Sequence, residues 1–510
     1  MERNPEAPAD GHPVLSCAEA KAWEAQLLRD EPAEWAAMER AGAAIGRAVL
    51  EDYREIGGLA SEGRILVLAG KGHNGGDALL AARAILAQRP ALRASVVLCF
   101  GARQLRPLAG RALDRLKADA PGRVEIVSAD DAFGANVTYA LCLDGVFGFQ
   151  FRAPMDDATA ALLARVNASA GIRFRAAVDL PSGVGETNAR TIFRADFTYA
   201  TGMVKRPVLS PRVSTFVGRL RYLDLGFFSG GAPEANEQIL TPAVLSSLLQ
   251  LRSSQTDKRT FGHVLIVGGS RSYPGAVMLA TRAALRSGAG LVTTFVPASL
   301  AAEYAAAHPE AMWVGCPETP KGGLAAGTVD LIRERLSRAT ALLVGPGMSA
   351  ETEVLATIQA ILRHTNNLPV VLDADALRAE IVELLKDRPF IGTPHAGEFE
   401  RIAPKLFVDG KFTAPHGVLV LKGPLTRVTD GRTIFHSPFG GPVLARGGSG
   451  DLLAGLIGGL LAQQPADPLR AALQGVAWHG RAADLLARAR GQVAVEISEL
   501  LEQLGPGLQS

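Results

Sequence analysis

The 510-residue sequence has few cysteines and no long apolar run. Its four cysteines are far apart and form no CxxC pair, which argues against a zinc site and against a disulfide framework. No uninterrupted apolar stretch reaches the ~18 residues of a membrane span. The polar, proline-rich start at Met1–Asp10 lacks the apolar core of a signal peptide. We therefore expect a cytoplasmic protein that does not contact membranes.

The sequence also has few lysines and a net charge close to zero. The net charge is +2 and no basic block occurs, so nucleic acid is not expected as a partner. Lysine accounts for only ten of the 53 basic residues, and four of these ten lie in the motifs described below: Lys71, Lys205, Lys258 and Lys422. Hydrophobic residues make up 48% of the chain, which indicates large cores in two or three domains. Alanine-rich helical faces would permit association, and we expect a homo-oligomer.

Short apolar runs alternate with helical segments throughout the first half, a pattern typical of a doubly wound parallel α/β sheet. The run Arg64–Gly70 is followed by the glycine-rich segment Lys71–Asp77 and then by a helix. Strand, glycine-rich loop and helix form a nucleotide-binding unit, although the spacing fits neither GxGxxG nor a P-loop. We expect a Rossmann-like three-layer domain in which Asp77 caps the helix.

Three oxygen donors follow strands of this predicted sheet: Asn74, Asp144 and Ser182. Because parallel strands end at one edge of a sheet, these side chains could surround a cation there. One carboxylate among neutral oxygens favours a monovalent ion over calcium. The alternative is that all three are ordinary turn and cap residues. Asp179 also stands at a strand end, directly before Pro181-Ser182-Gly183.

A surface connection separates the two halves. The segment Phe227–Asn236 is rich in glycine, alanine and proline. We place the domain boundary near residue 232, which gives domains 1–232 and 233–510.

The second half repeats the α/β pattern and ends in a distinctive glycine-rich stretch. Ala445–Asp451 contains three glycines and a serine and leads into an apolar helix. Converging backbone N–H groups at a helix N-terminus form an anion hole suited to a phosphate. Asp451 could take a proton from a hydroxyl that attacks a phosphoryl group, or could be a plain N-cap. Lys422 and Thr426 could hold phosphates.

Other polar residues at strand ends of this half have two interpretations each. His395 could bind substrate or cap a helix. Asp373 and Asp375 could assist a magnesium ion or bond only to the backbone.

The ordered motifs of the first half resemble the NAD(P)H-hydrate epimerase family from about Glu19 to Phe228. They are GKGHNGGD, DGVFG, VDLPSG, a threonine seven residues before Lys205, and a closing DLG. The resemblance implies that Asn74, Asp144 and Ser182 hold potassium and that Asp179 takes part in epimerisation. It implies a substrate site formed by His73, Asn74, Gly75, Gly76, Asp77, Gly148, Phe149, Gln150, Phe151, Arg152, Ala153, Pro154 and Asp179. The chain departs from the family at His73 and Ala78, where asparagine and glycine are usual, and in the loop after Phe147.

The motifs of the second half resemble the ADP/ATP-dependent NAD(P)H-hydrate dehydratase family, which has a ribokinase-like α/β fold. They include DKRxxGHVLIVGGS, YPGA, GPG, DADAL, TPHxGEF, LKG and GSGDLLAG, in this order. The resemblance implies that the hydrated nicotinamide nucleotide contacts Ala276, Gly347, His395 and Asp451. The adenine nucleotide, ADP or ATP with Mg²⁺, would contact Lys422, Gly423, Pro424, Leu425, Thr426 and Gly450.

Together the halves resemble bifunctional NAD(P)H-hydrate repair enzymes. This resemblance implies that the first domain interconverts the R and S hydrates of NADH and NADPH, and that the second dehydrates the S hydrate at the expense of a nucleotide. One alternative is a ribokinase-like small-molecule kinase with a non-catalytic N-terminal domain. Another is that the N-terminal fold serves only as a ligand- or protein-binding scaffold.

Overall fold

The computed structural model describes residues 10–134, 137–365 and 368–509. Residues 1–9, on which most of the signal-peptide argument rests, lie outside these ranges. The chain forms two compact units. The N-terminal unit comprises His12–Ala235 and Arg488–Gly491, whereas Asn236–Ala487 and Gln492–Ser510 belong to the C-terminal unit together with the segment that ends at Gly11. The chain thus passes between the units at four places rather than at one linker.

The N-terminal unit is built around a seven-stranded sheet in the order β4-β3-β2-β5-β6-β7-β9, in which every neighbouring pair is parallel. β2 is central: β3 adds on one side and β5 on the other, as in a doubly wound fold. The strands of this unit are β1 (Gly11–Leu15), β2 (Glu62–Ala69), β3 (Ala91–Leu98), β4 (Val124–Ile126), β5 (Leu141–Gly145), β6 (Arg175–Val178), β7 (Phe197–Thr201), β8 (Val204–Lys205) and β9 (Arg219–Leu223).

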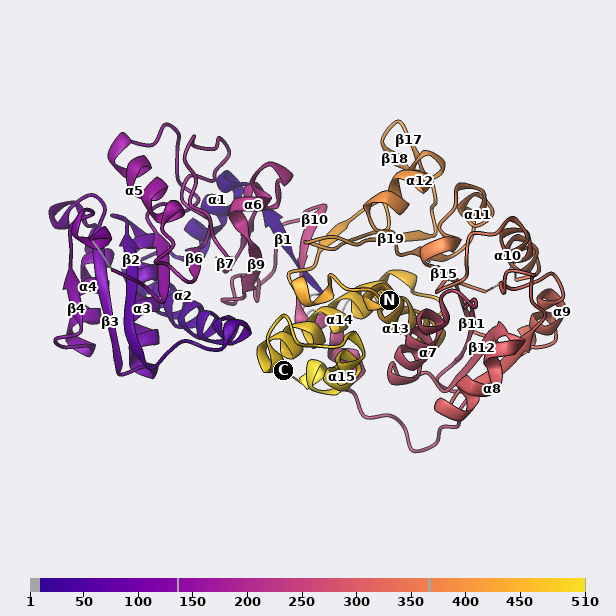
Figure 1. Ribbon diagram of the computed structural model, residues 1–510. Helices are drawn as coiled ribbons and strands as arrows, with labels where there is room; N and C mark the ends of the chain where they lie inside the picture. Colours follow the sequence, from indigo (N-terminus) through magenta and orange to yellow (C-terminus); the bar gives the residue numbers. More distant parts are fainter. Residues whose placement is uncertain (1–9, 135–136, 366–367, 510) are drawn as a thin grey trace. The chain divides into compact units, whose positions relative to one another are not determined.

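Helices cover both faces of this sheet (Figure 1). Apolar residues of α2, α3 and α4 pack on one face, and those of α5 on the other. The helices are α1 (Cys17–Leu27), α2 (Glu31–Asp52), α3 (His73–Gln88), α4 (Pro107–Asp119), α5 (Asp157–Ala168) and the short α6 (Ser214–Val217). The predicted Rossmann-like three-layer domain is confirmed, since the topology and both helical layers are present.

The C-terminal unit contains a second parallel sheet, in the order β13-β12-β11-β14-β15-β16-β19. β20 and β21 extend it in antiparallel pairs, and β10 lies parallel to β21. The strands are β10 (Glu237–Leu240), β11 (His263–Val267), β12 (Leu291–Pro297), β13 (Met312–Cys316), β14 (Ala341–Val344), β15 (Val370–Leu372), β16 (Phe390–Gly392), β17 (Phe407–Val408), β18 (Lys411–Phe412), β19 (Gly417–Leu421), β20 (Arg427–Thr429) and β21 (Ile434–His436).

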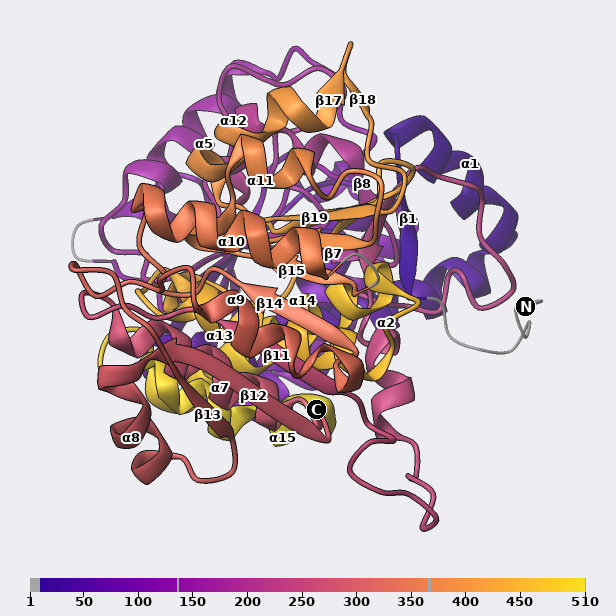
Figure 2. The ribbon, with the colours of Figure 1, turned by 90° about the vertical axis from the view of Figure 1, so that its right-hand side faces the viewer.

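Two helical layers cover this sheet as well, with α10 and α12 on one side of the strands and α7 and α15 on the other (Figure 2). The helices are α7 (Pro274–Arg286), α8 (Ala298–Ala307), α9 (Thr328–Arg333), α10 (Thr352–His364), α11 (Ala379–Glu383), α12 (Ala396–Leu406), α13 (Ser449–Gln463), α14 (Pro468–Arg490) and α15 (Leu500–Gln509). None of the helices in the described part of the chain combines the length and apolarity that a membrane span requires.

Candidate functional sites

A cavity of about 490 Å³ opens in the N-terminal unit at the carboxyl ends of β2 and β5. These neighbouring strands mark the point where the strand order reverses, which is where open α/β sheets bind ligands. The predicted residues His73, Asn74 and Asp77 line it from the start of α3, together with Asp179. The loop after β5 contributes Gly148, Phe149, Gln150, Phe151, Arg152 and Pro154.

Three predicted residues lie outside the lining of this cavity. Gly75 packs so closely on the preceding loop that a Cβ there would stand 2.2 Å from the carbonyl oxygen of Gly70. Gly76 packs in the same way on the Met38 side chain. Ala153 lies in the lining loop but does not itself line the cavity. Gly75 therefore allows α3 to start close to the loop that follows β2, and Gly76 allows Met38 of α2 to pack on α3.

The expectation that Asp77 caps α3 is wrong. The N-cap is Gly72 and α3 begins at His73, so Asp77 is already the fifth helical residue. Its carboxyl faces the cavity, and burial raises its pKa well above the ordinary value, with Asp179 and Glu24 adding to the shift.

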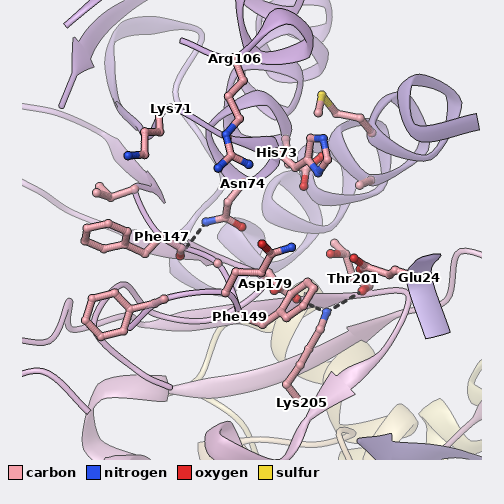
Figure 3. A pocket seen from close by; sticks show the side chains of 18 of the residues that line it. Glu24, Lys71, His73, Asn74, Arg106, Phe147, Phe149, Asp179, Thr201 and Lys205 are labelled. Carbon is pink, nitrogen blue, oxygen red and sulfur yellow. Dashed lines mark hydrogen bonds and ion pairs between the residues drawn. The ribbon is translucent and has the colours of Figure 1, made fainter. Parts of the chain in front are cut away.

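Asp179 and Lys205 form a buried ion pair at the closed end of the cavity (Figure 3). The Lys205 ammonium donates to Asp179 Oδ1 at 2.5 Å and to the Thr201 carbonyl at 3.3 Å, and it lies 5.0 Å from the centre of the Phe149 ring. Asp179 has a positive φ of 67°, a backbone conformation that is uncommon outside glycine and recurs at functional sites. β8 positions Lys205 by pairing with β1, where Leu15 is opposite Lys205.

The structure brings Asn74, Asp144 and Ser182 together around the backbone of Phe147. The Asn74 side-chain amide donates to the Phe147 carbonyl at 2.9 Å, and the Phe147 N–H donates to Ser182 Oγ at 2.9 Å. The Ser182 hydroxyl and N–H in turn donate to the Asp144 carboxylate at 2.6 and 2.7 Å. Burial raises the pKa of Asp144 to about 6, although both Ser182 bonds oppose the shift.

Several lining residues were not predicted as site residues from the sequence: Glu24, Glu34, Lys71, Arg106, Thr201 and Lys205. Lys205 had a signal, because it closes the threonine–lysine motif. No signal in the sequence pointed to Glu24 and Glu34, because α1 and α2 reach the cavity from a distant part of the sequence. His73 lies 3.3 Å from Glu34, so the residue that departs from the epimerase pattern has an acidic partner.

In the C-terminal unit, Lys422 lies among three carboxyl groups at the N-terminus of α13. Its ammonium is 2.9 Å from Asp373 Oδ1 and 3.9 Å from Glu398 Oε2. It also lies against Gly450, where a Cβ would be 3.2 Å from Nζ. The third carboxyl belongs to Asp451: burial raises its pKa to about 6, Asp373 adds to the shift and Lys422 opposes it.

The interpretation of Asp451 as a plain N-cap is wrong. α13 begins at Ser449 after Gly448, which takes a left-handed φ of 91° and provides no side-chain cap. Asp451 is the third residue of the helix, and the first backbone N–H groups have no capping side chain. Such a helix start offers donors and a positive dipole end to an anion.

The remaining predicted residues lie on neighbouring loops of this sheet. Ala276 and Gly347 are adjacent, since a Cβ on Gly347 would stand 2.9 Å from Ala276 Cβ. His395 is indeed an N-cap: its Nδ1 accepts from Gly397 and Glu398 at the start of α12. Its side chain is nevertheless exposed. The turn after Lys422 is made by Gly423, Pro424, Leu425 and Thr426, and the Thr426 hydroxyl contacts the Gly423 carbonyl at 3.5 Å.

Asp373 and Asp375 have different partners. Asp373 is buried, accepts from the Thr393 hydroxyl at 2.6 Å and pairs with Lys422. Asp375 pairs with Arg378 at 3.5 Å. Of the two interpretations offered for these residues, neither anticipated the contact between Asp373 and Lys422.

Comparison with known proteins covers both halves. A model of the NAD(P)H-hydrate dehydratase family matches residues 264–505, and one described as YjeF-related protein N-terminus matches residues 35–207. The bifunctional NAD(P)H-hydrate repair enzyme of Gloeobacter violaceus is 35% identical over 97% of both chains. The chain belongs to the family of bifunctional NAD(P)H-hydrate repair enzymes. Another member, from Moorella thermoacetica, is 34% identical over 92% of this chain and 91% of its own.

Solved structures match the C-terminal half of this member of the repair family. The ADP/ATP-dependent NAD(P)H-hydrate dehydratase of Bacillus subtilis, co-crystallised with ATP and Mg²⁺, is 27% identical, with a TM-score of 0.43. It covers 53% of this chain and 97% of its own. The parallel sheet with a helical layer on each face agrees with the α/β class predicted for this half.

Proposed function

We propose that the chain repairs hydrated NADH and NADPH, with one activity in each unit. The N-terminal unit interconverts the R and S hydrates, and the C-terminal unit dehydrates the S hydrate with ADP or ATP. The observation that carries this proposal is Asp451 beside Lys422 at the uncapped start of α13. An ionisable carboxyl and a cation at an anion-binding helix end suit proton removal coupled to phosphoryl transfer.

In the C-terminal unit, Asp451 takes the proton of the ring hydroxyl. The hydroxyl oxygen attacks the terminal phosphoryl group of the nucleotide, while the Gly447–Gly450 N–H groups and Lys422 stabilise the charge that develops. Phosphate then leaves and the ring double bond returns. Phosphorylation thus converts a poor leaving group into a good one, which explains why a dehydration would consume a nucleotide.

Lys422–Thr426 and Gly450 would hold the adenine nucleotide, and Ala276, Gly347 and His395 would contact the hydrate. Mg²⁺ enters as part of the nucleotide co-substrate, because it is usually held by substrate phosphates and only one or two carboxylates. In the N-terminal unit, Asp179 acts as acid–base residue and the cavity holds the nicotinamide end of the hydrate.

Asn74, Asp144 and Ser182 suit a potassium ion in the N-terminal unit. Asp144 is fully buried, and no lysine or arginine of the described residues pairs with it. A buried carboxylate without a counter-charge is costly, and a monovalent cation held by this carboxylate, an amide oxygen and a hydroxyl would compensate it. The ion would supply that charge and fix the loop at Phe147.

We also propose that the protein is cytoplasmic and forms a homo-oligomer. The four free cysteines suit a reducing compartment, and the alanine-rich helices permit association. Light scattering of the purified protein tests the oligomeric state, and fractionation of cells tests the location.

The experiment is the recovery of absorbance at 340 nm after mixing the protein with racemic NADH hydrate, ADP, Mg²⁺ and K⁺. Complete recovery is expected if both units act. Recovery that stops near half would mean that epimerisation is missing. No recovery with either nucleotide, together with a stable phosphorylated product, would overturn the dehydratase assignment in favour of a kinase.

A further inference from the structure

The closed end of the N-terminal cavity gathers more carboxyl groups than cations. Asp179 is paired with Lys205, but Glu24 of α1 and Asp77 of α3 also line the cavity and interact electrostatically with that pair. Figure 3 shows Glu24 and Thr201 on the same side of the cavity as Asp179 and Lys205. In the described part of the chain, the Glu24 carboxyl forms no hydrogen bond or ion pair.

Epimerisation of a hydrated dihydronicotinamide requires two groups that handle protons. This inference rests on the proposed function. Water adds to the enamine of the reduced ring so that the hydroxyl stands on the carbon bonded to the ring nitrogen. When that hydroxyl is protonated, the nitrogen lone pair forms a C=N bond and water departs. Water then returns to the other face of the planar carbon and loses a proton.

Asp179 accounts for one of these groups only. The Lys205 ammonium, itself 1% exposed, forms an ion pair with the Asp179 carboxylate, and this carboxylate suits a base that takes a proton from the arriving water. A proton must also reach the departing hydroxyl, and the carboxylate that serves as the base for the arriving water cannot supply it at the same time.

Three other carboxyl groups line the cavity, and they differ in their partners. Glu34 lies beside His73 in the more exposed part, with a side chain 36% exposed. Burial raises the pKa of Asp77 well above the ordinary value, with Asp179 and Glu24 adding to the shift. Burial raises the pKa of Glu24 to about 7, with Asp179 and Glu34 adding to the shift and Lys205 opposing it. Because its pKa is about 7 and its carboxyl has no partner among the described residues, Glu24 can both give and take a proton near neutral pH.

We propose that Glu24 is the second acid–base residue of the epimerase site, acting together with Asp179. In one direction Glu24 protonates the departing hydroxyl, the ring nitrogen supplies the electron pair, and Asp179 takes the proton of the arriving water. In the other direction the two carboxyl groups exchange these tasks. No oxidant or further reactant is needed.

Local contacts hold Glu24 over the cavity. α1 starts with a capping box between Ser16 and Glu19, and the Leu28 N–H donates to the Glu24 carbonyl at 2.8 Å. The preceding Trp23 donates from its indole N–H to the Phe227 carbonyl at 3.1 Å and stacks on Phe228. Glu24 therefore lies on an anchored helix, which suits a group that must meet the substrate at a fixed distance.

The test is the Glu24→Gln substitution in the full-length protein, assayed with purified R hydrate by chromatographic separation of the isomers. We expect the enzymatic rate to fall by about 10²–10⁴-fold, the usual contribution of a general acid or base. Dehydration of the S hydrate by the same chain should remain at the wild-type rate. Glu31→Gln is the matched control, because Glu31 is exposed at the start of α2 and does not line the cavity.

The pH profile separates proton transfer from a structural effect. Wild-type kcat/KM for epimerisation should fall above about pH 7, because Glu24 then loses its proton. Glu24→Gln should abolish this fall. Turnover in ¹⁸O-labelled water should place the label in the product hydroxyl, and retention of the original oxygen would overturn the water-loss step.

Two outcomes are clearly distinct. A Glu24→Gln protein that epimerises within about threefold of wild type, with the same pH profile, would overturn the role of Glu24 and leave the proposed function intact. A wild-type protein that does not accelerate epimerisation above the rate without protein would instead overturn the proposed function of the N-terminal unit.

Discussion

At the scale of single residues, each site contains one buried or half-buried lysine beside carboxyl groups, but the two sites differ in how many carboxyl groups share that lysine. Lys205 is committed to Asp179, whereas Lys422 is shared among Asp373, Glu398 and Asp451. Burial lowers the pKa of Lys422, yet these acids raise it overall, so the lysine stays charged. A shared lysine can be drawn towards an arriving phosphate without leaving its site.

The state of Asp451 should control the pH dependence of dehydration. Burial and Asp373 raise its pKa to about 6. A base must be ionised, and this carboxyl is ionised above its pKa, so kcat/KM for the S hydrate should be constant at neutral pH and fall as the pH drops below about 6. Initial rates at saturating nucleotide measure this. A fall that begins only near pH 4, the ordinary range for aspartate, would contradict the assignment.

Asp373 should position Lys422. Asp373→Asn removes the charge-assisted contact at 2.9 Å, and loss of an interaction worth about 1.5–3 kcal/mol corresponds to roughly 10–100-fold in kcat/KM for the nucleotide. Asp375→Asn is the matched control, since Asp375 contacts Arg378 instead. Equal effects of the two substitutions would show that the contact with Lys422 is unimportant.

At the scale of elements, the starts of α3 and α13 and the loops that follow the strands create the sites. The sequence predicts these starts well, because glycine-rich segments after apolar runs mark them. It places the caps wrongly: both aspartates expected as possible caps lie inside their helices, and glycines occupy the N-cap positions. Glycine loops permit several helix starts, and packing against the sheet selects one.

Potassium should stabilise the N-terminal unit through the loop at Phe147. A ligand that binds only the folded state at 100 times its Kd adds about 2.7 kcal/mol, so the melting temperature should rise when K⁺ replaces choline. Calorimetry measures the shift. Asn74→Ala, which removes one oxygen donor, should reduce the response, and an equal response in both proteins would count against the site.

The contact between α2 and α3 should depend on Gly42. A Cβ at this position would stand 2.4 Å from Leu80 Cβ, so Gly42→Ala should destabilise the N-terminal unit by about 1–3 kcal/mol through overpacking. Gly110→Ala is the control, and it should change stability in the opposite direction. Nothing lies within 4 Å of the Cβ position of Gly110 in α4, and replacing a glycine inside a helix stabilises the protein by about 0.5–1 kcal/mol. Thermal unfolding of both variants compares them; a stable Gly42→Ala protein would mean that the helices can separate at little cost.

At the scale of the whole molecule, the α/β class and the order of motifs could be predicted because strand periodicity and strand-end loops are local signals. The approach of α1 to the cavity could not, since Glu24 and Asp179 are joined only by tertiary packing. The same holds for Asp373, whose partner Lys422 follows several elements later. Sequence patterns identify which residues end strands, but not which side chains meet across loops.

The two activities should complement each other between molecules. Asp179→Asn and Asp451→Asn each disable one unit, so neither alone should recover more than about half of racemic NADH hydrate in the presence of ADP, after correction for uncatalysed epimerisation. A mixture should recover all of it, because the epimerised hydrate is released and rebound. Absorbance at 340 nm follows the recovery, and a mixture that stops near half would mean that the hydrate passes only within one chain.

The path of the backbone has a consequence for inheritance. Because the chain passes between the units at four places, one genetic crossover in the segment before Asn236 cannot exchange either unit intact. A recombinant gene would combine Asp10 and Gly11, or Arg488–Gly491, with a unit from another gene to which they are not fitted. Such hybrids should fold poorly, so we expect the two halves of this gene to be inherited together. Substitutions in each unit should be matched by substitutions in the short segments that join it from distant parts of the sequence.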